Sequence, residues 1–147
     1  MPESGERNDP YGAFNFLVEI DGVTVAGFSE VSGLTSETDV VEYRRGDQDI
    51  TVSKLPGLKK FTNITLKRGF TASDELWKWR KAVMDGQTQR QSGTVVLLNE
   101  ARAAAIKWTF REGWPSKWEG PAFNAKTSEV AIETLEIACE ALELELA

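Results

Sequence analysis

The chain has 147 residues, 41% of them apolar and 27% charged, as in one soluble globular domain. Its net charge of −6 argues against nucleic-acid binding, which needs clustered lysine and arginine, and no apolar run is long enough to span a membrane. The absence of histidine and the single cysteine exclude an internal disulfide and histidine-based catalysis. We therefore expect one domain over residues 1–147, without cofactor or metal, that is not an enzyme.

The N-terminal part predicts a polar arm followed by a β-hairpin. Residues 1–10 are polar, carry no secretory signal and are expected to form a flexible arm on a protein that folds in the cytoplasm. Between Phe14 and Ile20 apolar and polar residues alternate, which indicates a strand. Asp21-Gly22 is a hairpin-type turn, and Val23–Phe28 is predicted as the returning strand. Ser32-Gly33 then breaks the pattern.

The next segment alternates without a clear apolar face. Glu37–Arg44 is predicted as a strand whose two faces are both mixed, which suggests contact with something other than the core of its own chain. A polar loop is expected over Arg45–Ser53. Asp47 and Asp49 have the spacing of some calcium loops, but no glutamate follows at the required distance, so no metal site is predicted.

A turn, a strand and a helix are predicted between Lys54 and Gly86. Leu55-Pro56-Gly57 is a turn signal, and the alternation over Phe61–Phe70 predicts a half-buried strand. Ser73 is the expected N-cap of a short amphipathic helix that Gly86 ends. The predicted apolar face of this helix consists of Leu76, Trp79 and Val83, widened by Trp77 and Met84.

The C-terminal half predicts further strands. Thr94–Leu98 is a short apolar run, Asn99-Glu100 is a turn candidate, and Ile106–Arg111 alternates clearly. The segment Gly113–Pro121, with two tryptophans and two prolines, is predicted as an irregular aromatic loop. Glu129–Leu146 fits either a strand with a bulge near Ala141 or a helix, and pattern alone leaves both readings open.

Several blocks together resemble the tail-tube proteins of contractile phage tails and of the related extracellular contractile injection systems. In chain order these blocks are Asp9-Pro10-Tyr11, Phe14–Gly22 (FNFLVEIDG), Gly27–Leu34 (GFSEVSGL), Lys54–Leu58 (KLPGL), Asn63–Gly69 (NITLKRG) and Glu75–Arg80 (ELWKWR). The likeness covers nearly the whole chain. One departure is Cys139-Glu140-Ala141, where family members often have a His-Glu-Gly-type step, and this puts the path of the last strand in doubt.

The resemblance implies a mainly β fold, an antiparallel β-sandwich or small barrel with one short α-helix packed on its side. By analogy, it favours a long bent strand for Glu129–Leu146. It also implies a homo-hexameric ring that stacks into a hollow tube for cargo, with sheath and baseplate proteins as partners. The subunit would be assembled in the bacterial cytoplasm and form part of a virion or a phage tail-like particle.

Two sets of residues are candidates for contacts in such a tube. Stacked rings need a loop that sets their register, and the polar loop with its two apolar residues is the candidate. The expected inter-ring contact residues are Arg44, Arg45, Asp47, Asp49, Ile50, Val52 and Lys54. Glutamates dominate after Lys126, and Glu136 and Glu140 are the candidates for an acidic lumen wall. An ordinary solvated face explains these glutamates nearly as well.

Two other functions remain open at this level. One is a tube-initiating or baseplate paralogue of the same family that forms a single ring. The other is a monomeric β-sandwich that binds carbohydrate on a stacking platform of Trp114 and Trp118. No phosphate-binding glycine loop and no nucleophile motif supports an enzyme.

Overall fold

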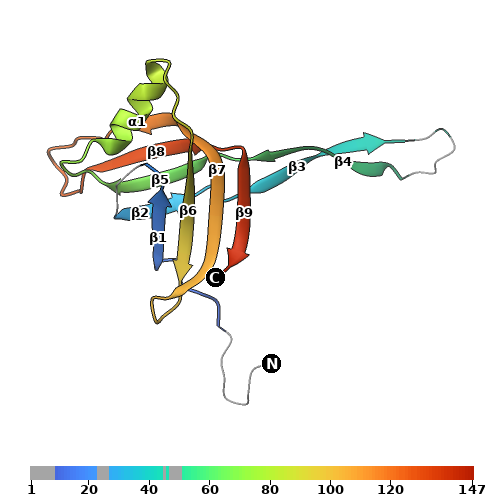
Figure 1. Cartoon of the computed structure of the whole chain (residues 1–147), viewed down its shortest axis with the longest axis horizontal. Coiled ribbons are helices and arrows are strands. Elements are labelled where there is room, and N and C mark those ends of the chain that lie inside the picture. The colour runs from blue at the N-terminus through green and yellow to red at the C-terminus, as the bar shows by residue number, and fades with distance from the viewer. Residues whose placement is uncertain (1–8, 23–26, 45, 47–50) are drawn as a thin grey trace, which may run out of the picture.

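The computed structural model describes residues 9–22, 27–44, 46 and 51–147, and Figure 1 shows their arrangement. The N-terminal segment of residues 1–10, which was predicted to be flexible, lies almost entirely outside the described residues. Most of the strand predicted over Val23–Phe28 lies outside them as well. The strands and the helix of the described chain are β1 (Phe16–Ile20), β2 (Phe28–Ser32), β3 (Ser36–Tyr43), β4 (Ser53–Phe61), β5 (Ile64–Gly69), α1 (Glu75–Met84), β6 (Gln91–Leu98), β7 (Ala104–Glu119), β8 (Ile132–Ala138) and β9 (Ala141–Leu146).

Two four-stranded antiparallel layers share the long strand β7. Sheet A consists of β1, β6, the first half of β7 and β9, and sheet B consists of the second half of β7, β8, β5 and β2. The strands of sheet A run across the direction of the strands of sheet B (Figure 1), as in a sandwich of two crossed sheets. Strand β7 turns the corner at Glu112, which adopts a left-handed φ of 54°. The mainly β class predicted from the sequence is therefore confirmed.

The core lies between the sheets, where the inward residues of each alternation meet. Ile64, Leu66, Phe110, Leu135 and Ile137 are almost fully buried. Helix α1 contributes Leu76 and Trp79 and packs along β7, so that it closes one end of the core. Its N-cap is Asp74 rather than the predicted Ser73, and no side-chain hydrogen bond caps the helix.

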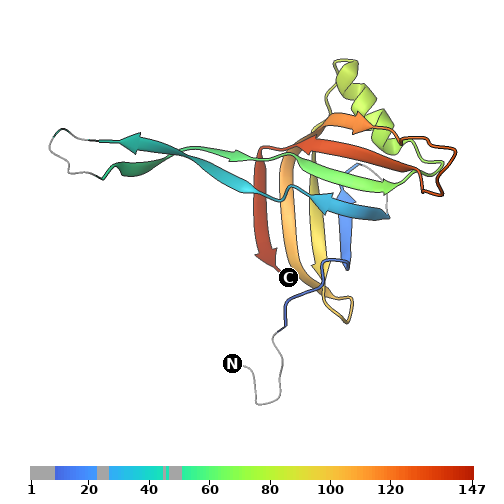
Figure 2. The same ribbon diagram turned by 180° about the vertical axis from the view of Figure 1, so that it is seen from behind.

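Strands β3 and β4 form a separate two-stranded ribbon that projects from the body (Figures 1 and 2). We call this ribbon, Ser36–Tyr43 with Ser53–Phe61, the arm. It continues the direction of β2 and β5 beyond a kink at Gly33, whose φ is +89°. A Cβ atom at Gly33 would lie 2.1 Å from the carbonyl oxygen of Asn63, so only glycine allows the two strands to approach here.

Two local predictions are wrong because tertiary pairing decides the conformation. The predicted hairpin is not among them, because its returning strand lies mostly outside the described residues; within these, β1 pairs with β6 and β2 pairs with β5. Leu55-Pro56-Gly57 lies inside β4 instead of in a turn. Gly113–Glu119 continues β7 instead of forming an irregular loop, because β8 pairs with this segment. A proline is tolerated in β4 because the second edge of that strand has no partner strand in the described chain.

The ambiguous C-terminal segment is strand, not helix. Glu129–Leu146 contains β8 in sheet B and β9 in sheet A, with Cys139 and Glu140 at the break between them. The apolar positions change parity at this break because the chain passes from one sheet to the other, and not because of a bulge within one strand. The amide of Glu140 donates to the carbonyl oxygen of Arg111 (3.1 Å), which holds the corner.

Candidate assembly interface

The arm exposes apolar side chains that nothing in the described chain covers. All eight residues of β3 are exposed, and the exposed fractions of Val40 and Leu58 reach 63% and 78%. An isolated two-stranded hairpin is at best marginally stable in water. The arm is therefore expected to need a partner.

The two faces of the arm differ in composition. The register pairs Val41 with Leu55 and Tyr43 with Ser53, which places three large apolar side chains on one face. The opposite face carries Val40, paired with Pro56, and the charged pair Glu42 and Lys54. The mixed faces that the sequence predicted for Glu37–Arg44 thus become one apolar face once β4 is added.

An ion pair lies near the base of the arm. The Nζ atom of Lys60 lies 3.0 Å from the Oδ1 atom of Asp39. The hydrogen bond and the charge of Asp39 raise the pKa of Lys60 above its ordinary value. Both side chains are half-exposed, so this pair contributes little to stability and mainly fixes the position where the register of the arm shifts.

The predicted contact residues lie only partly within the described chain. Arg44, Val52 and Lys54 occupy the far end of the arm, and all three are exposed. Arg45, Asp47, Asp49 and Ile50 lie outside the described residues.

The two predicted lumen residues occupy different environments. Glu136 lies on the outer face of sheet B, and its Oε1 atom accepts a hydrogen bond from Nδ2 of Asn63 (2.9 Å). Glu140 lies at the corner between the sheets, where its Oε1 atom is 3.5 Å from Nη1 of Arg90. The structure thus gives the two carboxylates different partners.

A buried ion pair on β5 and β8 is a feature that the sequence reasoning missed. Arg68 and Glu133 are directly opposite in the register and almost fully buried, and Nε of Arg68 donates to Oε1 of Glu133. The second carboxylate oxygen accepts from Nε1 of Trp118 (3.1 Å), and Nη2 of Arg68 donates to the carbonyl oxygen of Ser73 (3.1 Å). The pair therefore ties sheet B to the segment that leads into α1. The alternation on β8 contained the signal, since it places Glu133 on the same face as Leu135 and Ile137.

The predicted carbohydrate platform does not form. The register pairs Trp114 with Ala138 on the outer face of sheet B and Trp118 with Leu135 on the inner face, because an irregularity separates Pro115 from Lys117. The ring of Trp118 packs edge-on against Trp77, with 5.0 Å between ring centroids. The two tryptophans therefore cannot stack on one sugar.

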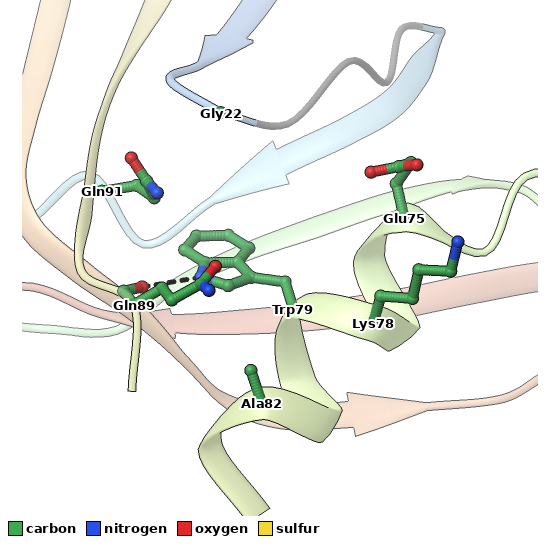
Figure 3. Close-up of a pocket in the computed structure, with 7 residues that line it drawn as sticks. All are labelled: Gly22, Glu75, Lys78, Trp79, Ala82, Gln89 and Gln91. Atoms are coloured by element: carbon green, nitrogen blue, oxygen red, sulfur yellow. Dashed lines mark hydrogen bonds between the residues drawn. The ribbon is translucent and has the colours of Figure 1, made fainter. Parts of the chain in front are cut away.

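The cavity drawn in Figure 3 lies between α1 and the strands beside it. It has a volume of about 210 Å³ and is lined by Gly22, Glu75, Lys78, Trp79, Ala82, Gln89 and Gln91. The indole Nε1 of Trp79 donates to the carbonyl oxygen of Gln89 (2.8 Å), which fastens α1 to the segment before β6. Its other polar side chains are the amides of Gln89 and Gln91, the carboxylate of Glu75 and the amine of Lys78.

Neither a metal site nor a membrane span is found in the described parts of the chain. No group of three or more acidic or cysteine side chains there could hold a metal ion. None of the helices in the described residues is long and apolar enough to cross a bilayer.

Cys139 is expected to react slowly. Its thiol lies half-buried at the break between β8 and β9, and this burial raises its pKa above the ordinary value. Because the thiolate is the nucleophile, iodoacetamide at pH 8 should alkylate Cys139 more slowly in the folded protein than in urea. Mass spectrometry of timed samples measures both rates, and equal rates would contradict a protected thiol.

Comparison with protein families shows which family the chain belongs to. The profile described as "T4-like virus tail tube protein gp19" matches residues 12–143, nearly the whole chain. The chain belongs to this tail tube family. A comparison with the sequences of characterised proteins found no significant match.

Solved structures of tube-forming particles have the same fold as this tail tube protein. A chain of the sheath–tube complex of an extracellular contractile injection system, PVC, has a TM-score of 0.84 and 26% identity, covering 94% of this chain and 93% of that one. A chain of the tube-terminating cap of the anti-feeding prophage has a TM-score of 0.86 and 25% identity, covering 97% and 95%. Hcp1 from Flavobacterium johnsoniae, at 17% identity over 89% and 94% with a TM-score of 0.56, shares the fold alone. This tail tube protein is thus a structural tube subunit.

Proposed function

We propose that the chain forms homo-hexameric rings that stack into a hollow tube for cargo. The observation that supports this best is the set of unfinished sheet edges: within the described chain, β1, β2 and β9 each pair with one strand only. Unpaired edges invite uncontrolled association unless something covers them. Pairing with neighbouring copies, around the axis of a ring or between stacked rings, removes these edges, and the pairing around the axis sets the size of the ring.

The arm is the proposed contact between rings. Its far end carries the candidate residues Arg44, Arg45, Asp47, Asp49, Ile50, Val52 and Lys54. A projecting element that binds a different surface on the next copy makes a heterologous contact. When such contacts do not close into a ring, the assembly can grow without limit. Charged side chains would set the register between rings, and the apolar ones would supply buried area.

The outer face of sheet B is the proposed lumen wall, and Glu136 lies on it. Lys117 is directly opposite Glu136, and Lys67 lies 3.7 Å from Glu30 on the same face. Glu119, paired with Thr134, lies on this face as well, so three glutamates stand beside two lysines and the wall is weakly acidic. A weakly acidic polar wall repels nucleic acid and binds few proteins tightly. Glu140 would lie at the margin of this wall.

The proposed setting of the subunit is a particle with sheath and baseplate proteins. The relative from PVC is part of a sheath–tube complex, and one from the anti-feeding prophage is part of a baseplate. By analogy, this chain would act as a single domain over residues 1–147, assembled in the bacterial cytoplasm. The role is architectural, without catalysis, cofactor or direct membrane insertion.

Negative-stain microscopy with native mass spectrometry tests this function. The expected result is rings of six 16.3 kDa subunits at low concentration and hollow rods at high concentration. A protein that remains monomeric at every concentration would contradict the proposal.

A ring that starts or ends a tube is the second candidate function. It is favoured by the similarity to a chain in the tube-terminating cap of the anti-feeding prophage. Closed rings that never stack, under conditions where the arm is intact, would favour this paralogue over a tube subunit.

A further inference from the structure

Part of sheet A carries an uncovered apolar face. Below β2, the strands of sheet A extend beyond the edge of sheet B (Figures 1 and 2). The register places six apolar side chains on the inner face of this extension, namely Phe16, Leu97, Ile106, Trp108, Leu144 and Leu146. We call this face the shelf. The exposed fractions of Leu144 and Leu146 are 59% and 79%, although they face the same side as the half-buried Leu142 and the buried Phe110.

The shelf borders the free edge of β2. A groove of about 420 Å³ lies between them. Val31 and Leu34 line one side, Phe16, Leu97 and Trp108 line the other, and Tyr11 and Ala13 of the segment before β1 also contribute to its lining. Strand β2 pairs with β5 on one side and with no described strand on the other. A strand placed over the shelf, parallel or antiparallel to β2, would both fill this groove and complete the backbone hydrogen bonds of β2.

The arm has the shape and composition of the missing cover, but it cannot reach its own shelf. It continues the direction of β2 and β5 away from the body (Figure 2), so an arm from another copy can lie in line with sheet B beside β2. Its apolar face, formed by Val41, Tyr43 and Leu55, is as unpartnered as the shelf. The two uncovered apolar surfaces cannot contact each other within one chain. They can cover each other when the arm of one copy binds the shelf of another.

We infer that the shelf is the docking site for the arm of a second copy of this chain, with the apolar face of the arm on the shelf and one arm strand along the free edge of β2. The inference rests on the proposed function, and it names the surface that receives the arm.

The charge of the arm agrees with this docking. Between Ser36 and Phe61 the sequence has five basic and five acidic residues, so this segment is neutral and the net charge of −6 belongs to the rest of the chain. A neutral arm can therefore approach a negative body without the repulsion that two bodies exert on each other.

Site-directed cross-linking tests the contact. In a Cys139→Ser background, Leu55→Cys on the arm and Leu144→Cys on the shelf are prepared as separate proteins, mixed and treated with a short bismaleimide. The expected main product is a covalent dimer of one arm variant and one shelf variant, identified by peptide mass spectrometry. The control replaces the shelf cysteine by Lys78→Cys on α1, an exposed position far from the shelf, and should give only background dimer. Equal yields from shelf and control cysteines would overturn the inference.

A matched pair of arm variants provides a second test. Val41→Asp places a charge on the apolar face, whereas Val40→Asp places the same charge on the opposite face one residue away. Val41→Asp is expected to abolish rods at concentrations where the parent forms them, and Val40→Asp is expected to retain them. Both residues are exposed, so circular dichroism should show the parental fold for both variants.

The outcomes separate the inference from the proposed function. Rods from the parent chain without arm-to-shelf cross-links, or rods that survive Val41→Asp, would refute the shelf as the receiving surface and leave the tube intact. A parent chain that forms neither rings nor rods would refute both.

Discussion

Glu133→Ala is expected to lower the free energy of unfolding by about 3–5 kcal/mol, because it leaves the buried guanidinium of Arg68 without its carboxylate. The same change removes the acceptor of the indole of Trp118. Helix α1 should loosen with it, since Arg68 also holds the carbonyl oxygen of Ser73. Urea unfolding followed by tryptophan fluorescence measures the loss.

The control for this variant lies in the same strand. Glu136→Ala removes a carboxylate from the exposed face of β8, where its hydrogen bond to Asn63 is accessible to water, and should change the stability by about 0.5 kcal/mol or less. Replacing the buried pair by Arg68→Met with Glu133→Leu should recover most of the loss, since an apolar pair leaves no unpaired charge. Equal effects of Glu133→Ala and Glu136→Ala would show that the buried pair has no special role.

Phe110→Ala is expected to destabilise the protein by about 3–5 kcal/mol. Phe110 is fully buried, and its ring packs directly over the backbone at two glycines. A Cβ atom would lie 2.4 Å from this ring at Gly93 and 2.7 Å from it at Gly113. Because backbone at β6 and at the bend of β7 cannot collapse far into the space, most of the cavity should remain.

Phe14→Ala is the matched control for this cavity. Phe14 is 87% exposed, so its truncation should change the free energy of unfolding by about 0.5 kcal/mol or less. The two variants are compared by thermal and urea unfolding under conditions that keep the assembly state equal. If Phe110→Ala lowered the free energy of unfolding only slightly, the prediction would be wrong, because the two sheets would then have collapsed into the cavity.

Alternation of apolar and polar residues was sufficient to predict a strand where one face of that strand is buried in the core of the chain. The patterns around Phe16–Ile20 and Ile64–Gly69 predicted β1 and β5, because a half-buried strand shows its period of two in the sequence. The helix was found for the same reason, with Leu76 and Trp79 on its buried face. Its N-cap was wrong by one residue, since no capping hydrogen bond fixes the start.

Pairing between distant segments was not predictable from local pattern. Asp21-Gly22 has the chemistry of a hairpin turn, but β1 before it pairs with β6 in sheet A and β2 after it pairs with β5 in sheet B. Leu55-Pro56-Gly57 has the chemistry of a turn, yet it lies in an arm strand with one free edge, where a proline costs no ladder bond. The second half of β7 reads as a loop because its tryptophans and prolines hide the alternation that β8 imposes.

The interface was predicted only in outline. The sequence indicated that Glu37–Arg44 contacts something outside its own core, but the apolar face appears only when the register brings Leu55 beside Val41. The shelf could not be predicted, because the residues on it belong to ordinary buried-strand patterns and become exposed only where sheet B ends. Glu133 was counted with the other C-terminal glutamates, since charge composition alone does not distinguish a buried acid from a solvated one.

Hydrogen–deuterium exchange above and below the concentration of assembly tests the central claim most directly, namely that copies of the chain complete one another's sheet edges. The amides on the free edge of β2 and along the arm are predicted to exchange rapidly in dilute protein and to become protected in the assembly. The inner strands β5 and β8 should be protected in both states. Equal exchange of the β2 and arm amides in the two states would contradict the claim.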